Sequence, residues 1–328
     1  MAESVRGDGF SEKFYDNFKK SKFYEVYKKH TDELFIGVRD GYINIYYNCA
    51  SIAKIRGKRG TVGKAQINEY YLKQDSKDDK YVSITEDDFV KYYEHIKARS
   101  DAKVNLEKKS QERLVLDNNN NPNSGWYCLD VEYMKSICGE RKPWRFDIIA
   151  ISKSKPHCVA LIELKYGSGA IGGESGIQKH IKDYKTFHDE KGFVEYLKSE
   201  IVGILKKQKE LGVGVPKEFD DIKKQDVLDI PKIYVITLDN NKDSTEGSTP
   251  KMKMGGYLFK DKNKWNSPKV ADNVLNDKNI KYYDFESIIE KIKPTFLFSK
   301  AKLVSGRLNK PITDILAENN YEDVEKFD

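Results

Sequence analysis

The sequence lacks the long apolar runs that mark membrane proteins. No stretch approaches the roughly 20 consecutive apolar residues that a membrane-spanning helix needs. The first residues, Met1–Phe18, contain no apolar core of the kind found in signal peptides. We therefore expect a cytoplasmic protein that has no membrane partner.

Cysteine and histidine are scarce as well, with four and five among 328 residues. The cysteines form no C-x-x-C pair and lie near no cluster of histidines, a pattern that argues against a zinc site. No histidine is paired with another residue at a spacing typical of metal ligands. We predict that the thiols are reduced and buried. The cysteines are Cys49, Cys128, Cys138 and Cys158.

Charge, in contrast, is abundant: 34% of the residues are charged and the net charge is +6. This composition is typical of a folded protein, and the length suits one large domain or two smaller ones. A positive excess suits a polyanionic partner such as nucleic acid. It does not demonstrate one, because any lysine-rich protein carries the same excess.

The first third of the chain has the pattern of β-strands followed by a helix. Asp40-Gly41 separates two strand-like runs and is a strong signal for a two-residue hairpin. Thr85 with Asp88 resembles a capping box, and it opens a helical pattern in which Phe89, Tyr92, Tyr93 and Ile96 share one face.

The clearest break in the chain is Asp117–Gly125, where Asn, Pro and Gly favour turns. We place a domain boundary there. It separates an N-terminal β-rich and helical region, residues 1–117, from a second domain, residues 118–328. A long loop inside a single domain is nearly as good an interpretation.

The chain after this break predicts an α/β fold. Three strand-like runs are followed by two helical patterns and then by a further apolar strand. The strands are expected at 126–134, 145–152, 157–166 and 232–240, and the helices at about 175–190 and 193–211.

Hairpin geometry predicts a charged cluster at the ends of these strands. If the second turn centres near Lys155, Asp147 lies opposite Glu163, with Cβ atoms about 4.5–5.5 Å apart. Lys165 is two residues further along and returns to the same face. A turn at Gly139-Glu140 likewise places Glu132 opposite Asp147, with Asp130 on the same strand face. A β-bulge would break either register.

Such a cluster predicts metal chemistry. Neighbouring carboxylates repel one another unless a cation neutralises them. Mg²⁺ takes one or two protein carboxylates together with waters and substrate phosphate, and it lowers the pKa of a bound water. A nearby lysine can stabilise developing negative charge. The alternative is a buried structural salt bridge between Glu163 and Lys165.

Asp147, followed by Glu163-x-Lys165 at the end of an apolar strand and then by a helix, resembles the PD-(D/E)XK nuclease superfamily. The resemblance covers about residues 126–240, and it departs from the family pattern in having no proline before Asp147. It implies a restriction-endonuclease-like core, in which helices flank a mixed β-sheet. It also implies Mg²⁺, with Mn²⁺ as a substitute, held by Asp147 and Glu163, with Lys165 as the catalytic lysine. Some branches carry a glutamine on the next helix, and Gln178 is the candidate here, although a solvent-facing residue is an equal alternative.

We therefore predict a Mg²⁺-dependent nuclease, with DNA favoured over RNA, acting in restriction, defence or repair. Glu132 is a candidate third metal ligand. A homodimer would let it address both strands of a duplex, and the N-terminal region would bind substrate or a partner. The alternative is a non-catalytic module that binds nucleic acid or protein. Candidate contacts to the nucleic-acid backbone are Lys179, Lys182, Lys185 and Arg145. The three lysines could equally form the solvated face of an amphipathic helix.

Two rival motifs fit less well. Gly167, Gly169 and Gly172 match the G-x-G-x-x-G dinucleotide fingerprint, which requires an acidic residue at the end of a strand about 20 residues later. The residues at that distance look helical instead. Gly57–Ala65 resembles a phosphate-binding P-loop but has one residue too many and lacks the required Ser or Thr.

Overall fold

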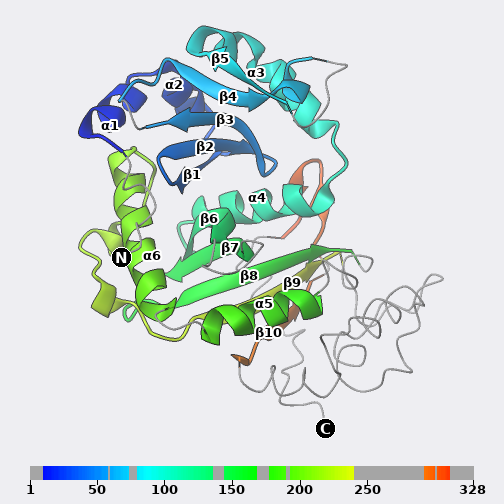
Figure 1. The fold of residues 1–328 in the computed structure, drawn as a ribbon. Coiled ribbons are helices and arrows are strands. Elements are labelled where there is room, and N and C mark those ends of the chain that lie inside the picture. The colour runs from blue at the N-terminus through cyan, green and yellow to red at the C-terminus, as the bar shows by residue number, and fades with distance from the viewer. Residues whose placement is uncertain are drawn as a thin grey trace, which may run out of the picture.

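The computed structural model describes residues 10–57, 60–73, 80–135, 144–167, 177–189, 193–239, 292–299 and 301–310. These residues form two five-stranded β-sheets and the helices that pack on them (Figure 1). The structure therefore confirms a mixed α/β fold. Among the described helices, none combines the length and the apolar character needed to cross a membrane.

The first sheet is antiparallel, with its strands in sequence order. Arg39 pairs with Tyr42, so Asp40-Gly41 forms the whole hairpin loop, as predicted. Gly41 has φ +68°, a value that glycine adopts at little cost. The strands are β1 (Phe35–Arg39), β2 (Tyr42–Tyr47), β3 (Ala50–Arg56), β4 (Lys64–Asn68) and β5 (Tyr81–Thr85).

Helices cover one side of this sheet: α1 (Glu12–Lys19), α2 (Lys22–Lys29) and α3 (Glu86–Asp101). Thr85 Oγ1 accepts a hydrogen bond of 3.2 Å from the Asp88 N–H, so the predicted cap is present. Phe89 packs against Phe23 of α2, with ring centroids 5.1 Å apart. Of the four residues predicted to share one face of α3, Phe89, Tyr93 and Ile96 are buried, whereas Tyr92 is 37% exposed.

The second sheet is mixed, in the order β10-β9-β8-β7-β6. Strands β6 to β8 are antiparallel neighbours, whereas β8, β9 and β10 run parallel. The strands are β6 (Trp126–Lys135), β7 (Trp144–Ser152), β8 (Val159–Tyr166), β9 (Lys232–Leu238) and β10 (Thr295–Phe298). Further elements are the 3-10 helices η1 (Glu69–Tyr71), η3 (Lys217–Phe219) and η4 (Lys224–Asp226), and a small ribbon of β11 (Leu303–Val304) and β12 (Arg307–Leu308).

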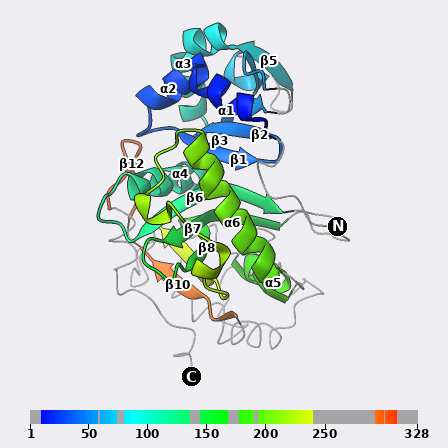
Figure 2. The ribbon, with the colours of Figure 1, turned by 90° about the vertical axis from the view of Figure 1, so that its left-hand side faces the viewer.

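Helices cover both faces of the mixed sheet. Apolar residues of α5 (Ile177–Asp189) and α6 (Phe193–Glu210) pack on the face that includes Leu161, whereas α4 (Leu106–Asn119) packs on the face that includes Ile162. Figure 2 shows α6 extending from the mixed sheet to the N-terminal elements, where it contacts β1. Because β8 is covered on both sides, its sequence is a continuous apolar run up to Ile162.

Helix α4 lies between the two sheets (Figure 1). Its Leu114, Val115 and Leu116 share one apolar cluster with residues of both, among them Phe35 from β1 and Val131 from β6. The helix extends into the asparagine-rich segment that had indicated a break. Asn118 and Asn119 there hydrogen bond to the backbone of β6. The domain boundary near residue 117 stays a prediction.

The described cysteines are reduced and buried, as predicted. Cys49, Cys128 and Cys158 are free thiols, and Cys138 lies outside the described residues. Burial raises the pKa of the Cys128 thiol to about 12. Such thiols stay protonated and unreactive at neutral pH.

A buried ion pair joins the two sheets. Arg39, at the end of β1, places Nη1 2.6 Å from Oδ1 of Asp130 in β6, and its Nη2 donates to the Val131 carbonyl at 2.7 Å. The two side chains are 8% and 1% exposed. Asp130 was expected near the candidate metal site, and this expectation is wrong. A register shift between Cys128 and Asp130, together with φ +51° at Glu132, breaks the strand alternation on which the expectation depended.

We predict that breaking this pair from one side is more costly than removing it altogether. Asp130→Leu leaves the Arg39 guanidinium buried and unpaired, so the variant should lose about 3–5 kcal/mol of unfolding free energy. The double variant Arg39→Met/Asp130→Leu should recover most of that loss, as measured by denaturant titration. Asp16→Ala, which removes an exposed ion pair with Lys19, is the control and should change little. Equal losses in the single and double variants would contradict the prediction.

A second prediction concerns Glu112, which is buried in α4 and accepts a hydrogen bond from the Cys49 N–H. Burial raises the pKa of Glu112 to about 8, against the opposing effects of that hydrogen bond and of Arg113. From about pH 5 to about pH 8, the folded state holds a proton that the unfolded state releases. Stability attributable to this residue should therefore fall as pH rises, by up to about 1.4 kcal/mol per pH unit. Glu112→Gln should flatten the decline, and parallel stability–pH curves for variant and wild type would refute the assignment.

Candidate active site

The pairing of β7 with β8 brings Asp147 and Glu163 together. Ile148 pairs with Ile162, and Ile151 pairs with Val159, so Asp147 and Glu163 are the next opposed residues along the hairpin. The predicted register is therefore confirmed. The side chain of Asp147 reaches β8 directly, because its Oδ2 accepts a hydrogen bond of 2.8 Å from the Leu164 N–H.

Glu163 is the centre of the cluster. Its side chain is 1% exposed, and its Oε1 lies 2.6 Å from Nζ of Lys165 and 3.0 Å from Nε2 of His180 in α5. The Tyr184 hydroxyl, one turn further along α5, donates to Oε2 at 3.4 Å. Burial opposes ionisation of Glu163, but the hydrogen bond and charge of His180 and the charge of Lys165 outweigh it and lower the pKa of this carboxyl.

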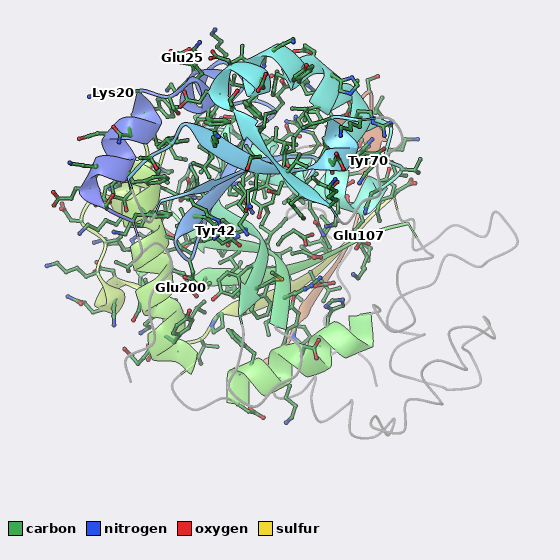
Figure 3. The ribbon with its side chains drawn as sticks, turned by 45° about the horizontal axis from the view of Figure 1, so that its top comes forward. Lys20, Glu25, Tyr42, Tyr70, Glu107 and Glu200 are labelled. Atoms are coloured by element: carbon green, nitrogen blue, oxygen red, sulfur yellow. The ribbon has the colours of Figure 1, made fainter. Side chains whose placement is uncertain are left out.

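Lys165 is held between two carboxylates. Besides Glu163, its Nζ lies 3.5 Å from Oε1 of Glu107, in the first turn of α4, and the lysine side chain is 4% exposed. Burial alone would lower the pKa of Lys165, but the charges of Glu163, Asp147 and Glu107 raise it. The side chain is therefore a cation at neutral pH. Glu107, the second residue of α4, is labelled in Figure 3.

The pKa of Asp147 is shifted in the opposite direction from that of Glu163. Burial and the charge of Glu163 raise the pKa of Asp147 well above the usual range of an aspartate, and Lys165 and the Leu164 N–H only partly compensate. The hydrogen bond from Leu164 is the only one that Asp147 makes among the described residues. The residue is half-buried, so one carboxylate oxygen is left for a further partner.

Glu132 completes the acidic group on the third strand. Val131 pairs with Ile148 and Tyr133 pairs with Phe146, which puts Glu132 level with Asp147, as predicted. The charge of Glu132 contributes to the raised pKa of Asp147. Its Oε2 lies 3.5 Å from Nζ of Lys108 in α4. Across the described ranges, no three His, Cys, Asp or Glu residues are arranged as a metal-binding group.

The helix after β8 contributes residues that the sequence did not single out. His180 and Tyr184, four residues apart on α5, both contact Glu163. The predicted contacts on the same helix are only partly visible, because the side chains of Gln178, Lys179 and Lys182 lie outside the described residues. Lys185 pairs with Asp189 at 2.8 Å and Arg145 is exposed, so both are placed at the surface near the site.

The helix α5 also bears on the dinucleotide-binding alternative. The residues about 20 positions after Gly167, Phe187 to Asp189, lie in α5 and do not end a strand. The geometry that the dinucleotide fingerprint requires is therefore missing.

No protein-family model, no curated protein and no solved structure matches this chain.

Proposed function

We propose that this chain is a Mg²⁺-dependent nuclease of the PD-(D/E)XK type that hydrolyses phosphodiester bonds, with DNA as the favoured substrate. The observation that supports the proposal is the convergence of Asp147, Glu163 and Lys165 on one hairpin, with a cation and two carboxylates in mutual electrostatic contact. The mixed sheet with helices on both faces is compatible with a restriction-endonuclease-like core.

The two carboxylates suit a magnesium ion. The raised pKa of Asp147 means that its ionised form is destabilised, and a bound cation would relieve this. Asp147 and Glu163 would hold the ion, which matches the one or two carboxylates that Mg²⁺ takes from proteins. Glu132 is a further candidate ligand, although Lys108 approaches it. When bound, Mg²⁺ polarises a phosphoryl oxygen and lowers the pKa of a coordinated water.

The chain's own residues would orient the reacting groups. The Lys165 ammonium has three donors, and its described partners are Glu163 and Glu107, which leaves capacity for a water or a phosphate oxygen. There it would stabilise negative charge that develops on the phosphate. His180 and Tyr184 hold the Glu163 carboxylate in place from α5 and act as positioning residues.

The alternative of a buried structural salt bridge between Glu163 and Lys165 predicts that these two side chains are paired, and they are. A salt bridge between these two residues alone does not explain Asp147. A purely structural pair gains nothing from a second carboxyl group beside it, whose pKa is raised by burial and by the charge of Glu163. Ionisable groups perturbed in this way are typical of functional sites. We therefore infer that the pair belongs to a catalytic arrangement.

The second candidate function is a non-catalytic module that binds nucleic acid or protein. One observation favours it: Nζ of Lys165 and Nε2 of His180 lie 2.6 and 3.0 Å from Oε1 of Glu163, so this carboxylate already has two side-chain partners within the chain. The two functions differ in whether Mg²⁺ binds and whether a phosphodiester is cut.

For the nuclease, we propose a cytoplasmic setting in restriction, defence or repair, with a homodimer suited to duplex cleavage.

We predict that the protein cleaves nucleic acid in Mg²⁺ or Mn²⁺ and not in EDTA. Plasmid DNA, single-stranded DNA and RNA would be compared by gel electrophoresis. Lys165→Ala should abolish cleavage and leave substrate binding largely intact, because the lysine acts on charge that develops during the reaction. Asp147→Ala should abolish cleavage together with Mg²⁺ binding measured by calorimetry.

The matched control is Lys198→Ala. Lys198 in α6 is also a buried lysine that pairs with a carboxylate, Asp229, but it lies outside the candidate site. This variant should cleave at the wild-type rate, and thermal melting would verify that all variants are folded. Cleavage that survives in Lys165→Ala would refute the role of this lysine. Absence of both cleavage and Mg²⁺ binding in the wild type would favour the non-catalytic module.

A further inference from the structure

A cavity of about 350 Å³ lies next to the candidate active site, on the side of the first sheet. Residues from the turn before β3, from β3, β4, η1 and β5, and from α3, α4 and the segment between these helices line it. The size falls within the range of about 300–1,000 Å³ that is typical of small-molecule sites. The cavity is separate from the cluster around Glu163, because none of Asp147, Glu163 and Lys165 lines it.

The cavity is lined by positive charge. Lys103, Lys108 and Lys109 contribute to its wall, and neither Asp nor Glu is among the residues that line it. Lys103 lies over the Tyr70 ring, with Nζ 4.0 Å from the centroid, and Lys109 donates to the Asp101 carbonyl at 2.8 Å. Three amines around one hollow without a carboxylate in the wall favour an anionic occupant.

The remaining wall suits a nucleobase. Tyr81 lines the cavity and is 56% exposed, so the ring is available for stacking, whereas Tyr71 is buried in the wall. Aromatic rings next to basic side chains are the usual means by which proteins bind nucleotides without regard to sequence. The amide side chains of Asn68 and Asn105 also reach the cavity, and amides pair with base edges.

The first turn of α4 connects the cavity to the candidate site. Glu107 contacts Lys165, whereas its neighbours Lys108 and Lys109 line the cavity. Lys108 belongs to both places, since its Nζ also lies 3.5 Å from Glu132. The first turn of α4 therefore contacts both the proposed catalytic lysine and the cavity.

We propose that this cavity binds a nucleoside phosphate, with the phosphate against Lys103 and Lys109 and the base against Tyr81. The same chemistry has two sources, a free nucleotide or one nucleotide of a strand that is bound in the candidate active site. The strand form rests on the proposed nuclease function, whereas the free nucleotide does not. Binding is measured in EDTA, so the test is independent of cleavage.

The test uses the full-length protein in EDTA and two probes, AMP measured by calorimetry and a fluorescein-labelled single-stranded oligonucleotide measured by anisotropy. Lys103→Ala/Lys109→Ala and Tyr81→Ala should each weaken binding of the occupying probe by about tenfold or more. Tyr81→Phe keeps the ring and should bind like the wild type. The matched control is Lys91→Ala, because Lys91 also covers a tyrosine ring, that of Tyr92, but does not line the cavity.

The results distinguish a free nucleotide from a nucleotide of a bound strand. If AMP binds and the cavity variants lose this binding, the occupant is a free nucleotide. If only the oligonucleotide binds and the same variants lose this binding, the occupant is part of a strand. Inorganic phosphate that competes as well as AMP would overturn the nucleotide assignment. The proposal is equally overturned if neither probe binds, or if the cavity variants bind like Lys91→Ala. Wild-type cleavage combined with unchanged binding in the cavity variants would reject the cavity and retain the nuclease.

Discussion

The pairing register of β7 and β8 is the constraint on which the candidate site depends. A slip by one residue would send the side chains of one strand to the opposite face and separate Asp147 from Glu163. The register is secured by apolar residues that are buried on both faces of these strands, including Ile148, Ile149 and Leu161. The hydrophobic core thus determines where the charges meet, and the charges themselves contribute little to the choice. The apolar packing thus offsets the cost of bringing these ionisable groups together.

Within the cluster, Glu163 and Asp147 respond differently to the same burial. Glu163 has Lys165 and His180 as partners, and its pKa is lowered, whereas the pKa of Asp147 is raised. Two neighbouring carboxyl groups with pKa values pushed apart are a common sign of divided roles in catalysis. Asp147 is the group whose state would change most when a cation arrives. The first turn of α4 adds to this balance, because Glu107 holds Lys165 from the opposite side.

Much of this arrangement could be predicted from the sequence, because it depends on local pairing. The positions of Asp147, Glu163 and Glu132 follow from counting residues outward along paired strands. The contributions of His180, Tyr184 and Glu107 could not be predicted, because they come from helices whose orientation is set by tertiary packing. The failure at Asp130 has a different cause, since a β-bulge and a positive φ leave no clear signal in the sequence. The asparagine-rich segment misled for a related reason: its side chains bond to β6 rather than to solvent.

Helix α4 contributes residues to both proposed sites. Its body is packed between the sheets, and Glu112 and Leu114 are buried there, so the helix cannot move without disturbing the apolar cluster that it shares with both sheets. Its first turn places Glu107 on the lysine of the candidate active site and Lys109 on the cavity. Lys108 lines the cavity and also lies 3.5 Å from Glu132, so one side chain borders both the cavity and the acidic group. The two places are therefore adjacent because they use neighbouring residues of a single helical turn.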